Sequence, residues 1–465
     1  MRVLVQLRPT RAPVPDAAAL AGGAAGGGLP AGFVIDTAYA PVPIPTPVAE
    51  EEGGDRFSLT APRHFAAAPE DVTHVVRGAI PDGAGQVAAY ADLTANPDVV
   101  GVFSDPVIES SIVCPGDPAV GSDADVAKQL GVAALGGKGM NGTGVTVAIV
   151  DTGFNLPYLK SKGLTLKFSA AKSWTPAGVA TKPGQHPVNH GTMCAYDVAI
   201  AAPKATFIDY AVLLSQTPGA TQMAGLLSDA VVAYSKLRQV IAGMSASRRS
   251  LVVSNSWGMF SPAWDFPVGH PGNYSDNPAH PFNVIVASLE ADGADILFAA
   301  GNCGRDCPDG RCAFGATRPI CGANSHPAVL SVAGIDVKRR RVGYSSQGPG
   351  RLAQQKPDIS SYTHFKGSGV YPEDGGTSAA CPVLAGLVAA VRSKFPGSRV
   401  SPADLRTTMF KTAIGLGKPG FDYDYGWGAP DPDALTAALG STGSGTARRR
   451  SAASTRRRRS PARAA

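Results

Sequence analysis

Short apolar runs rich in β-branched residues recur through the middle of the chain. They cover residues 145–150, 205–213, 251–253, 296–302 and 329–333. Runs of this length without polar alternation are typical of strands buried on both faces of a parallel sheet. Between them, apolar residues return at helical spacing, notably from Met223 to Ile241. Alternating strands and helices predict an α/β fold with three layers and a doubly wound, mostly parallel sheet.

Two apolar stretches predict buried helices that begin with polar, glycine-containing motifs. His190-Gly191-Thr192 leads into residues 198–202, and Gly376-Thr377-Ser378 leads into residues 383–391. Ser401, followed by a proline and then an acid at the third position, has the pattern of a capped helix start.

The amino-terminal part has a weaker pattern that predicts a small α+β unit. Strand-like runs lie at residues 3–7, 74–78, 99–103 and 106–109, with a short helical pattern through Val87, Tyr90 and Leu93. Residues 17–28 are rich in Ala and Gly, and residues 40–47 are rich in Pro, so both stretches are interpreted as low-complexity linker.

Four polar residues stand at the ends of these predicted elements. Asp151 and Asn302 each follow a strand, whereas His190 and Ser378 each begin a helix. Singly, such residues are typical turn formers or helix caps. As a set they have the chemistry of acyl transfer: a serine nucleophile, a histidine base, a carboxylate to orient the base, and an amide to bind an oxyanion.

The motifs Asp151-Thr-Gly, His190-Gly-Thr, Ala-Ala-Gly-Asn302 and Gly-Thr-Ser378-x-Ala-x-Pro, in this order, resemble those of the subtilisin-like serine peptidases, the subtilases (peptidase family S8). The resemblance covers roughly residues 125–439. It implies a Ser-His-Asp triad and an oxyanion hole that Asn302 shares with the Ser378 amide. Ala379 stands where the family usually has Met, a difference that removes no catalytic atom.

The same resemblance implies a peptide-binding segment. Ser256, Trp257 and Gly258 match the subtilase segment whose backbone pairs with an extended substrate, and Ala300 and Gly301 match the wall of the pocket beside it. Strand pairing gives affinity without recognising side chains, so broad specificity is expected. The preferred substrate side chains stay open.

The amino-terminal unit is similar to the subtilase inhibitory propeptide, and an unrelated α+β module is the alternative. The predicted organisation is a propeptide-like domain with a low-complexity insert at 1–112, a linker and processing region at 113–124, a catalytic domain at 125–440 and a tail at 441–465. In the propeptide interpretation, the enzyme is made as a self-inhibited zymogen and cuts itself between residues 109 and 123.

Charge separates the tail from the rest of the chain. The 465 residues carry a net charge of +6, and 44% are apolar, as in globular proteins. Residues 448–465 contain eight arginines and no acid, so the remainder carries −2. The tail is expected to be disordered, and it is interpreted either as a dispensable extension or as a site that attracts nucleic acid or an anionic membrane.

Seven cysteines bear on cofactors and compartment. Cys303, Cys307, Cys312 and Cys321 follow Asn302 closely, and two disulfides within this cluster are expected, with zinc or free thiols as alternatives. Cys194 and Cys381 are interpreted as buried small hydrophobes, and Cys114 is left over. No cofactor is expected for the chemistry, and structural calcium, common in the family, has no assignable ligands.

Localisation and partners follow less directly. No signal peptide or membrane-spanning run is recognised, which favours the cytoplasm or an unrecognised export route, whereas disulfides favour an oxidising compartment. A monomeric serine endopeptidase that acts on peptides or proteins is predicted. The alternative is a catalytically silent subtilase fold that binds partners and is tethered by its basic tail.

Overall fold

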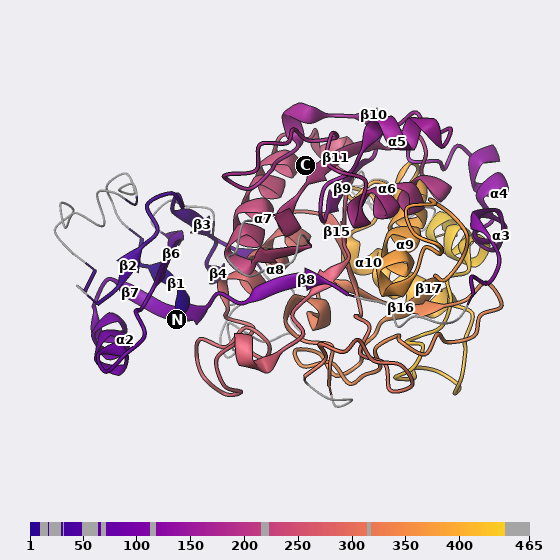
Figure 1. The fold of residues 1–465 in the computed structure, drawn as a ribbon. Coiled ribbons are helices and arrows are strands. Elements are labelled where there is room, and N and C mark those ends of the chain that lie inside the picture. Colours follow the sequence, from indigo (N-terminus) through magenta and orange to yellow (C-terminus); the bar gives the residue numbers. More distant parts are fainter. Residues whose placement is uncertain are drawn as a thin grey trace, which may run out of the picture.

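The computed structural model describes residues 1–9, 17, 29–30, 32–48, 64–66, 71–111, 118–214, 223–313 and 318–441. Nearly all of the linker expected at 17–28, Cys114 and the tail from residue 442 lie outside these residues. A large body holds the central sheet, and a smaller amino-terminal unit, drawn in indigo, lies against one side of it (Figure 1). Within the described ranges, no helix has both the length and the apolar character needed to cross a membrane.

The central sheet has seven strands in the order β10-β11-β9-β13-β15-β16-β17, and all neighbours are parallel. Of these strands β9 comes first along the chain, β10 and β11 lie on one side of it and β13, β15, β16 and β17 on the other, so the strand order reverses between β9 and β13. Open α/β sheets place their sites at the carboxyl ends of strands beside such a reversal. The strands are β9 (Thr146–Val150), β10 (Lys167–Phe168), β11 (Thr206–Tyr210), β13 (Leu251–Asn255), β15 (Ala294–Ala299), β16 (Leu330–Ile335) and β17 (Ile359–Tyr362).

Helices cover both faces of this sheet, and alternate strand residues face opposite layers. Val147 and Ile149 pack in the cluster with α6 and α9, whereas Ala148 and Val150 pack in the cluster with α7 and α8. The predicted α/β fold with a doubly wound parallel sheet is therefore confirmed. The first layer contains α3 (Asp123–Gln129), α4 (Val132–Gly137), α5 (Leu156–Ser161), α6 (His190–Ala201), α9 (Gly376–Arg392) and α10 (Pro402–Thr412), and the second contains α7 (Leu227–Ala242) and α8 (Pro281–Ala291).

The expected helix cap at Ser401 is present, because its side chain accepts a hydrogen bond from the Asp404 N–H. The helix predicted from Met223 starts too early in the sequence. Residues Ala224–Leu226 form a strand, β12, and α7 begins only at Leu227. Backbone pairing of this stretch with residues 107–109, which are distant in sequence, overrides the local periodicity there.

The amino-terminal unit is an antiparallel sheet in the order β2-β6-β1-β7, with β3 also paired to β6. Its helix α2 (Gln86–Ala95) buries Leu93, but Val87 is 81% exposed and does not belong to the core. The other elements are β1 (Arg2–Leu7), β2 (Val34–Ile35), β3 (Val42–Ile44), β6 (Thr73–Ala79), β7 (Val99–Ser104) and the separate pair β4 (Pro47–Val48) with β5 (His64–Phe65).

The prediction of a linker at 40–47 was wrong. β3 lies in this stretch, and Val42 and Ile44 are buried. The strand is stabilised by pairing with β6 and by packing against the second helical layer, and neither contact is visible in a proline-rich local sequence.

One face of the amino-terminal sheet packs on the large body. Leu4, Val75 and Phe103 share a buried cluster with α7 and α8. Polar contacts join the same surfaces: the Tyr39 hydroxyl donates to the Ser228 carbonyl at 3.0 Å, and Arg77 pairs with Asp229 at 3.1 Å. The unit therefore has a fixed position relative to the central sheet.

Candidate active site

Asp151 and His190 form a buried pair at the carboxyl end of β9. The distance between His190 Nδ1 and Asp151 Oδ1 is 2.8 Å, and because a carboxylate only accepts, Nδ1 is the donor. Asp151 Oδ1 also accepts from the Thr152 N–H at 2.7 Å, which fixes the carboxylate. The bond leaves His190 Nε2 as the ring nitrogen available for proton transfer.

Two glycines let the site elements approach each other closely. A Cβ on Gly191 would lie 2.4 Å from the Gly153 carbonyl oxygen, and a Cβ on Gly386 would lie 2.5 Å from the Val198 carbonyl oxygen. These glycines bring the first turn of α6 against the loop after β9, and α9 against α6. His190 and Ser378, each in the first turn of its helix, are thereby brought into one layer above the sheet.

Ser378 Oγ and His190 Nε2 are both buried and have no hydrogen-bond partner among the described residues. Most buried polar atoms in folded proteins are paired, and these two belong to the smaller set that is unpaired within the described residues. Nucleophile–base hydrogen bonds are often long in the absence of substrate. The arrangement is suited to a proton transfer that becomes favourable when a substrate is bound.

Asn302 follows β15, and the start of α9 orients its side chain. Asn302 Oδ1 accepts from the Thr377 N–H at 2.9 Å and from Thr377 Oγ1 at 3.0 Å. Thr377 Oγ1 in turn accepts from the Gly301 N–H at 3.0 Å. Because the amide oxygen is fixed in this way, the amide nitrogen of Asn302 is held on the other side of the side chain as a donor.

Cys194 lies one turn after His190 in α6. Its Sγ is 3.7 Å from Asp151 Oδ2 and 3.8 Å from His190 Nδ1, and burial, reinforced by the Asp151 charge, raises the pKa of the thiol well above its usual value. These three side chains are the one group of possible metal ligands that lies close together in the described ranges. Calcium prefers oxygen ligands, so this group does not fit a structural calcium site.

A second buried carboxyl lies next to the Asp151 loop. Asp209 on β11 accepts from the Gly184 N–H at 2.8 Å and lies 3.6 Å from His186 Nε2. Burial raises the pKa of Asp209 to about 7, although the hydrogen bonds from Gly184 and Phe154 oppose the shift. Burial also lowers the pKa of His186.

The expected peptide-binding segment is occupied by the chain itself. β8 (Val107–Ser110) runs from the amino-terminal unit into the large body and lies between β12 and β14 (Trp257–Gly258), antiparallel to both (Figure 1). Trp257 pairs with Ser110 and Gly258 with Glu109. Continuing this register by one residue puts Ser111 opposite Ser256, whose hydroxyl donates to the Ser378 carbonyl at 3.0 Å.

The side chains of the expected pocket residues differ in direction. Trp257 contributes its backbone to β14, but its ring is buried against Phe282 and Phe298, and its Nε1 donates to the Val150 carbonyl at 3.0 Å. Ala300 and Gly301 lead from β15 to Asn302, and the Ala300 N–H donates to Val332 O at 2.9 Å.

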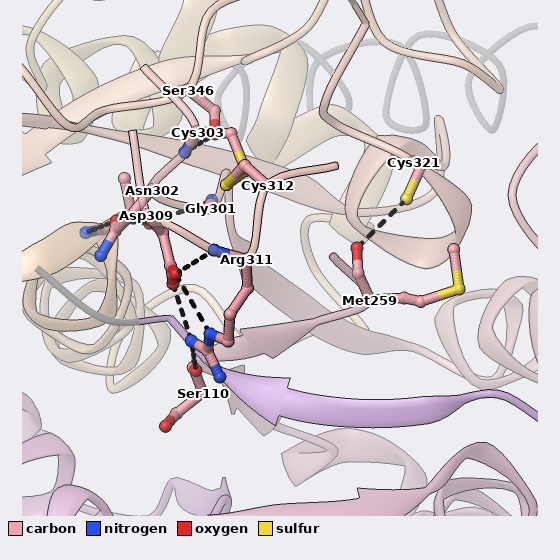
Figure 2. Close-up of a disulfide and its surroundings, with 11 residues drawn as sticks. Ser110, Met259, Gly301, Asn302, Cys303, Asp309, Arg311, Cys312, Cys321 and Ser346 are labelled. Atoms are coloured by element: carbon pink, nitrogen blue, oxygen red, sulfur yellow. Dashed lines mark hydrogen bonds and ion pairs between the residues drawn. A yellow bond between two sulfur atoms is a disulfide. The ribbon is translucent and has the colours of Figure 1, made fainter. Parts of the chain in front are cut away.

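The prediction for the cysteine cluster was correct only in part. Cys303 and Cys312 form a disulfide, and Cys307 is also disulfide-bonded. Cys321, however, is a buried free thiol whose Sγ lies 3.7 Å from the Met259 carbonyl oxygen, away from the loop (Figure 2). Proximity in sequence was misleading because residues 318–325 return to the core rather than to the loop.

The disulfide loop carries an arginine, Arg311, that belongs to none of the sequence motifs. Arg311 pairs with Asp309 on its own loop and with Glu109 of β8. Burial alone would lower the pKa of Arg311, but hydrogen bonds and charges from the two carboxylates raise it instead. The only local signal in the sequence is that Asp309 and Arg311 carry opposite charges within a cysteine-rich insert. Glu109, with which Arg311 also pairs, is distant in sequence.

Comparisons with known proteins show which family this chain resembles in sequence. The model of the subtilase family matches residues 142–428. M-protease from Shouchella clausii (strain KSM-K16) is 27% identical over 308 residues, which cover 64% of this chain and 66% of that protein. Subtilisin E from Bacillus subtilis (strain 168) is 26% identical over 298 residues, which cover 62% of this chain and 65% of that protein. Subtilisin BL from Lederbergia lenta is 26% identical over 304 residues, which cover 64% of this chain and 93% of that protein.

The matches span slightly less than two thirds of the first two relatives. The range matched by the family model includes every proposed site residue from Asp151 to Ser378. Since the family model covers more than half of the chain, with the site motifs in their family order, the chain belongs to the subtilase family.

Proposed function

We propose that this protein is a serine endopeptidase in which Ser378 attacks the scissile carbonyl of a peptide. His190 takes the serine proton through Nε2 and later gives it to the leaving amine. Asp151 holds the imidazole in the required tautomer and stabilises the imidazolium. The 2.8 Å bond from His190 Nδ1 to Asp151 supports this assignment, as do the unpaired Nε2 and Oγ atoms.

The Asn302 amide and the Ser378 N–H are the proposed donors to the oxyanion. Ser378 lies in the first turn of α9, where backbone N–H groups have no partner within the helix and the helix dipole favours negative charge. The bonds from Thr377 to Asn302 Oδ1 support the role of the amide nitrogen, because they hold it before charge develops.

Substrates are proposed to bind as an extended strand between β12 and β14, as β8 does here. Ser256, Trp257 and Gly258 would pair through their backbones, beside a pocket wall formed by Ala300 and Gly301. The antiparallel pairing of β8 with both strands supports this mode. It is the observation that carries the proposal, because it aligns a peptide chain with the proposed nucleophile.

The amino-terminal segment is proposed to inhibit the enzyme that carries it. Besides β8, Asp105 supports this, since its carboxylate accepts from the Ser228 N–H at 2.8 Å and from the Ser228 hydroxyl at 3.0 Å in the first turn of α7. Because Ser111 continues the register to the position opposite Ser256, we propose that the chain cuts itself after Ser111. A catalytically silent binding role is not favoured by a site with all four chemical groups.

The test of catalysis is labelling of the full chain with a fluorophosphonate, which reacts with activated serines. The wild type is expected to be labelled, and Ser378→Ala is expected not to be. Ser161→Ala, which removes an exposed hydroxyl bonded only within its own helix, is the matched control. Labelling that survives in Ser378→Ala would exclude Ser378 as the nucleophile.

Self-processing is tested separately by intact mass. The wild type should yield a fragment that ends at Ser111, and Ser378→Ala should remain full length. Equal processing of both chains would point to another protease and would contradict self-cleavage.

A further inference from the structure

Arg311 lies where a loop of the large body meets the peptide strand in the cleft. Its Nη2 donates to the Ser110 carbonyl at 2.7 Å (Figure 2). Its Nη1 pairs with the Glu109 carboxylate. Arg311 therefore contacts the backbone of β8 at Ser110 and one side chain of that strand, Glu109. A backbone contact does not select a sequence, whereas a contact with a carboxylate does.

Asp309 fixes the direction of the guanidinium group. Arg311 Nε donates to Asp309 Oδ1 at 3.1 Å and Nη2 donates to Asp309 Oδ2 at 2.7 Å, a two-pronged arrangement that sets the plane of the group. The remaining nitrogen, Nη1, is thereby directed at β8. The charge contact with Glu109 thus needs little rearrangement of the arginine, which lowers the entropic cost of binding a carboxylate there.

The loop that carries Arg311 is held at several points. The Cys303–Cys312 disulfide closes it, and the Asp309 N–H donates to the Asn302 carbonyl at 2.7 Å. On the other side, the Ala313 N–H donates to the Phe260 carbonyl at 3.1 Å, and the Arg311 guanidinium lies 4.9 Å from the Phe260 ring centre. The arginine is therefore attached to the same segment as the proposed oxyanion residue.

The site is partly shielded from water. The side chain of Asp309 is 1% exposed, that of Glu109 8% and that of Arg311 24%. Pairs between exposed charges contribute little because water and salt screen them, whereas a partly buried, hydrogen-bonded pair can discriminate between side chains. Asp309 balances the charge of Arg311 even when no peptide lies in the cleft. When a peptide is bound, Arg311 can still donate a hydrogen bond to a second carboxylate.

We propose that Arg311 forms a binding subsite for an acidic side chain on the third residue before the scissile bond, so that the enzyme favours peptides with Glu or Asp there. Glu109 occupies this subsite in the present structure, three residues back from a cut after Ser111. The proposal rests on the proposed function for the position of the cut, but the pairing of Arg311 with a carboxylate in the cleft does not depend on catalysis.

The first experiment measures kcat/KM for three peptides of the sequence of residues 104–111, each with an amide-linked fluorogenic group after the last serine. They carry Glu, Gln or Lys at the position of Glu109, and the enzyme is the full chain after self-processing. A charge-assisted hydrogen bond predicts about a tenfold preference for Glu over Gln, and a larger one over Lys. Arg311→Ala should reduce each ratio to about twofold or less, and Arg311→Glu should favour Lys.

Arg305→Ala is the matched control, because this arginine lies on the same loop and its side chain is exposed. It should keep the wild-type ratios. The proposal would be overturned if the wild type hydrolysed the Glu and Gln peptides with kcat/KM values within about twofold of each other. It would also be overturned if the preference for Glu survived in Arg311→Ala.

The second experiment needs no catalysis. In the full chain carrying Ser378→Ala, hydrogen exchange of the β8 amides reports how firmly the strand is held. Glu109→Lys and Arg311→Glu should each speed exchange about tenfold or more, and the two together should restore protection. If the single changes have no effect, or if the exchanged charges do not restore protection, the subsite is refuted.

The two experiments separate the two proposals. If no peptide is hydrolysed by the wild type, the peptidase assignment fails, and the exchange result alone decides whether Arg311 binds a carboxylate. If peptides are hydrolysed without a charge preference, the peptidase assignment stands and the substrate subsite is refuted. Melting temperatures of all variants identify any that fail to fold.

Discussion

Replacing Thr377 by valine removes one hydroxyl that joins two parts of the proposed oxyanion site. Thr377 Oγ1 donates to Asn302 Oδ1 at 3.0 Å and accepts from the Gly301 N–H at 3.0 Å. Valine has nearly the same shape and can do neither. The backbone N–H of residue 377 still donates to Asn302, so the amide loses one of the two bonds from residue 377.

The size of the effect follows from these contacts. The Gly301 N–H is left without its acceptor, which costs about 1–3 kcal/mol of stability. In a domain of this size, that lowers the melting temperature by roughly 2–8 °C. Loss of the oxyanion-hole asparagine in a subtilisin costs roughly 100- to 1000-fold in kcat. A less firmly held amide should cost less, so we expect a fall in kcat of about tenfold.

The assay is steady-state hydrolysis of one peptide by wild type, Thr377→Val and Thr377→Ser. Because Thr377 is proposed to act on the transition state through Asn302, kcat should fall while KM stays nearly constant. Thr377→Ser keeps the hydroxyl and should retain most of the activity. A kcat for Thr377→Val within about twofold of the wild type, or an equal loss in Thr377→Ser, would refute this account.

Three other changes test the pH dependence, the core and the thiol of this fold. Burial raises the pKa of Asp209 to about 7 from 3.8, so the folded state binds a proton that the unfolded state releases, and stability should fall as pH rises between these values. Asp209→Asn should flatten this fall in melting temperature between about pH 4 and pH 8, and an unchanged slope would contradict the shift. Arg392 is 1% exposed and pairs with Asp295 at 2.6 Å. Arg392→Met should therefore lower the free energy of unfolding by about 3–5 kcal/mol, measured by thermal unfolding, and Asp295→Asn should partly restore it. A decrease of less than about 1 kcal/mol would contradict a buried pair. Mercuric ion should inhibit peptide hydrolysis by binding Cys194, whose Sγ lies 3.8 Å from His190 Nδ1. The Cys194→Ala variant should resist this inhibition. Equal inhibition of both enzymes would place the reactive thiol elsewhere.

Much of the central fold was predictable from local patterns. A strand buried on both faces must be apolar throughout, which is why β9, β13, β15 and β16 could be placed within a few residues. Helix starts carry their own signals, and Ser401 is the clearest example. The α/β class follows from the alternation of these elements.

The candidate site was predictable for a related reason. Asp151 and Asn302 end parallel strands, and such ends meet at one edge of a sheet. His190 and Ser378 begin helices that pack against the same layer. Residues fixed to the ends of regular elements can therefore be assigned to one site before any distance is known.

Tertiary structure decided the features that depend on pairing between distant segments. The stretch Ala224–Leu226 has helical periodicity but forms β12, because backbone hydrogen bonds with β8 require no particular side chains and leave no pattern in the sequence. The disulfide partners and the free state of Cys321 depend on where a loop turns. The same holds for Arg311, which meets Glu109 across 202 residues of chain. The sequence by itself determined the fold class and the chemical groups of the site, since both are encoded locally; only the folded chain decided what lies in the cleft and which charge faces it, because those contacts join residues that local patterns cannot relate.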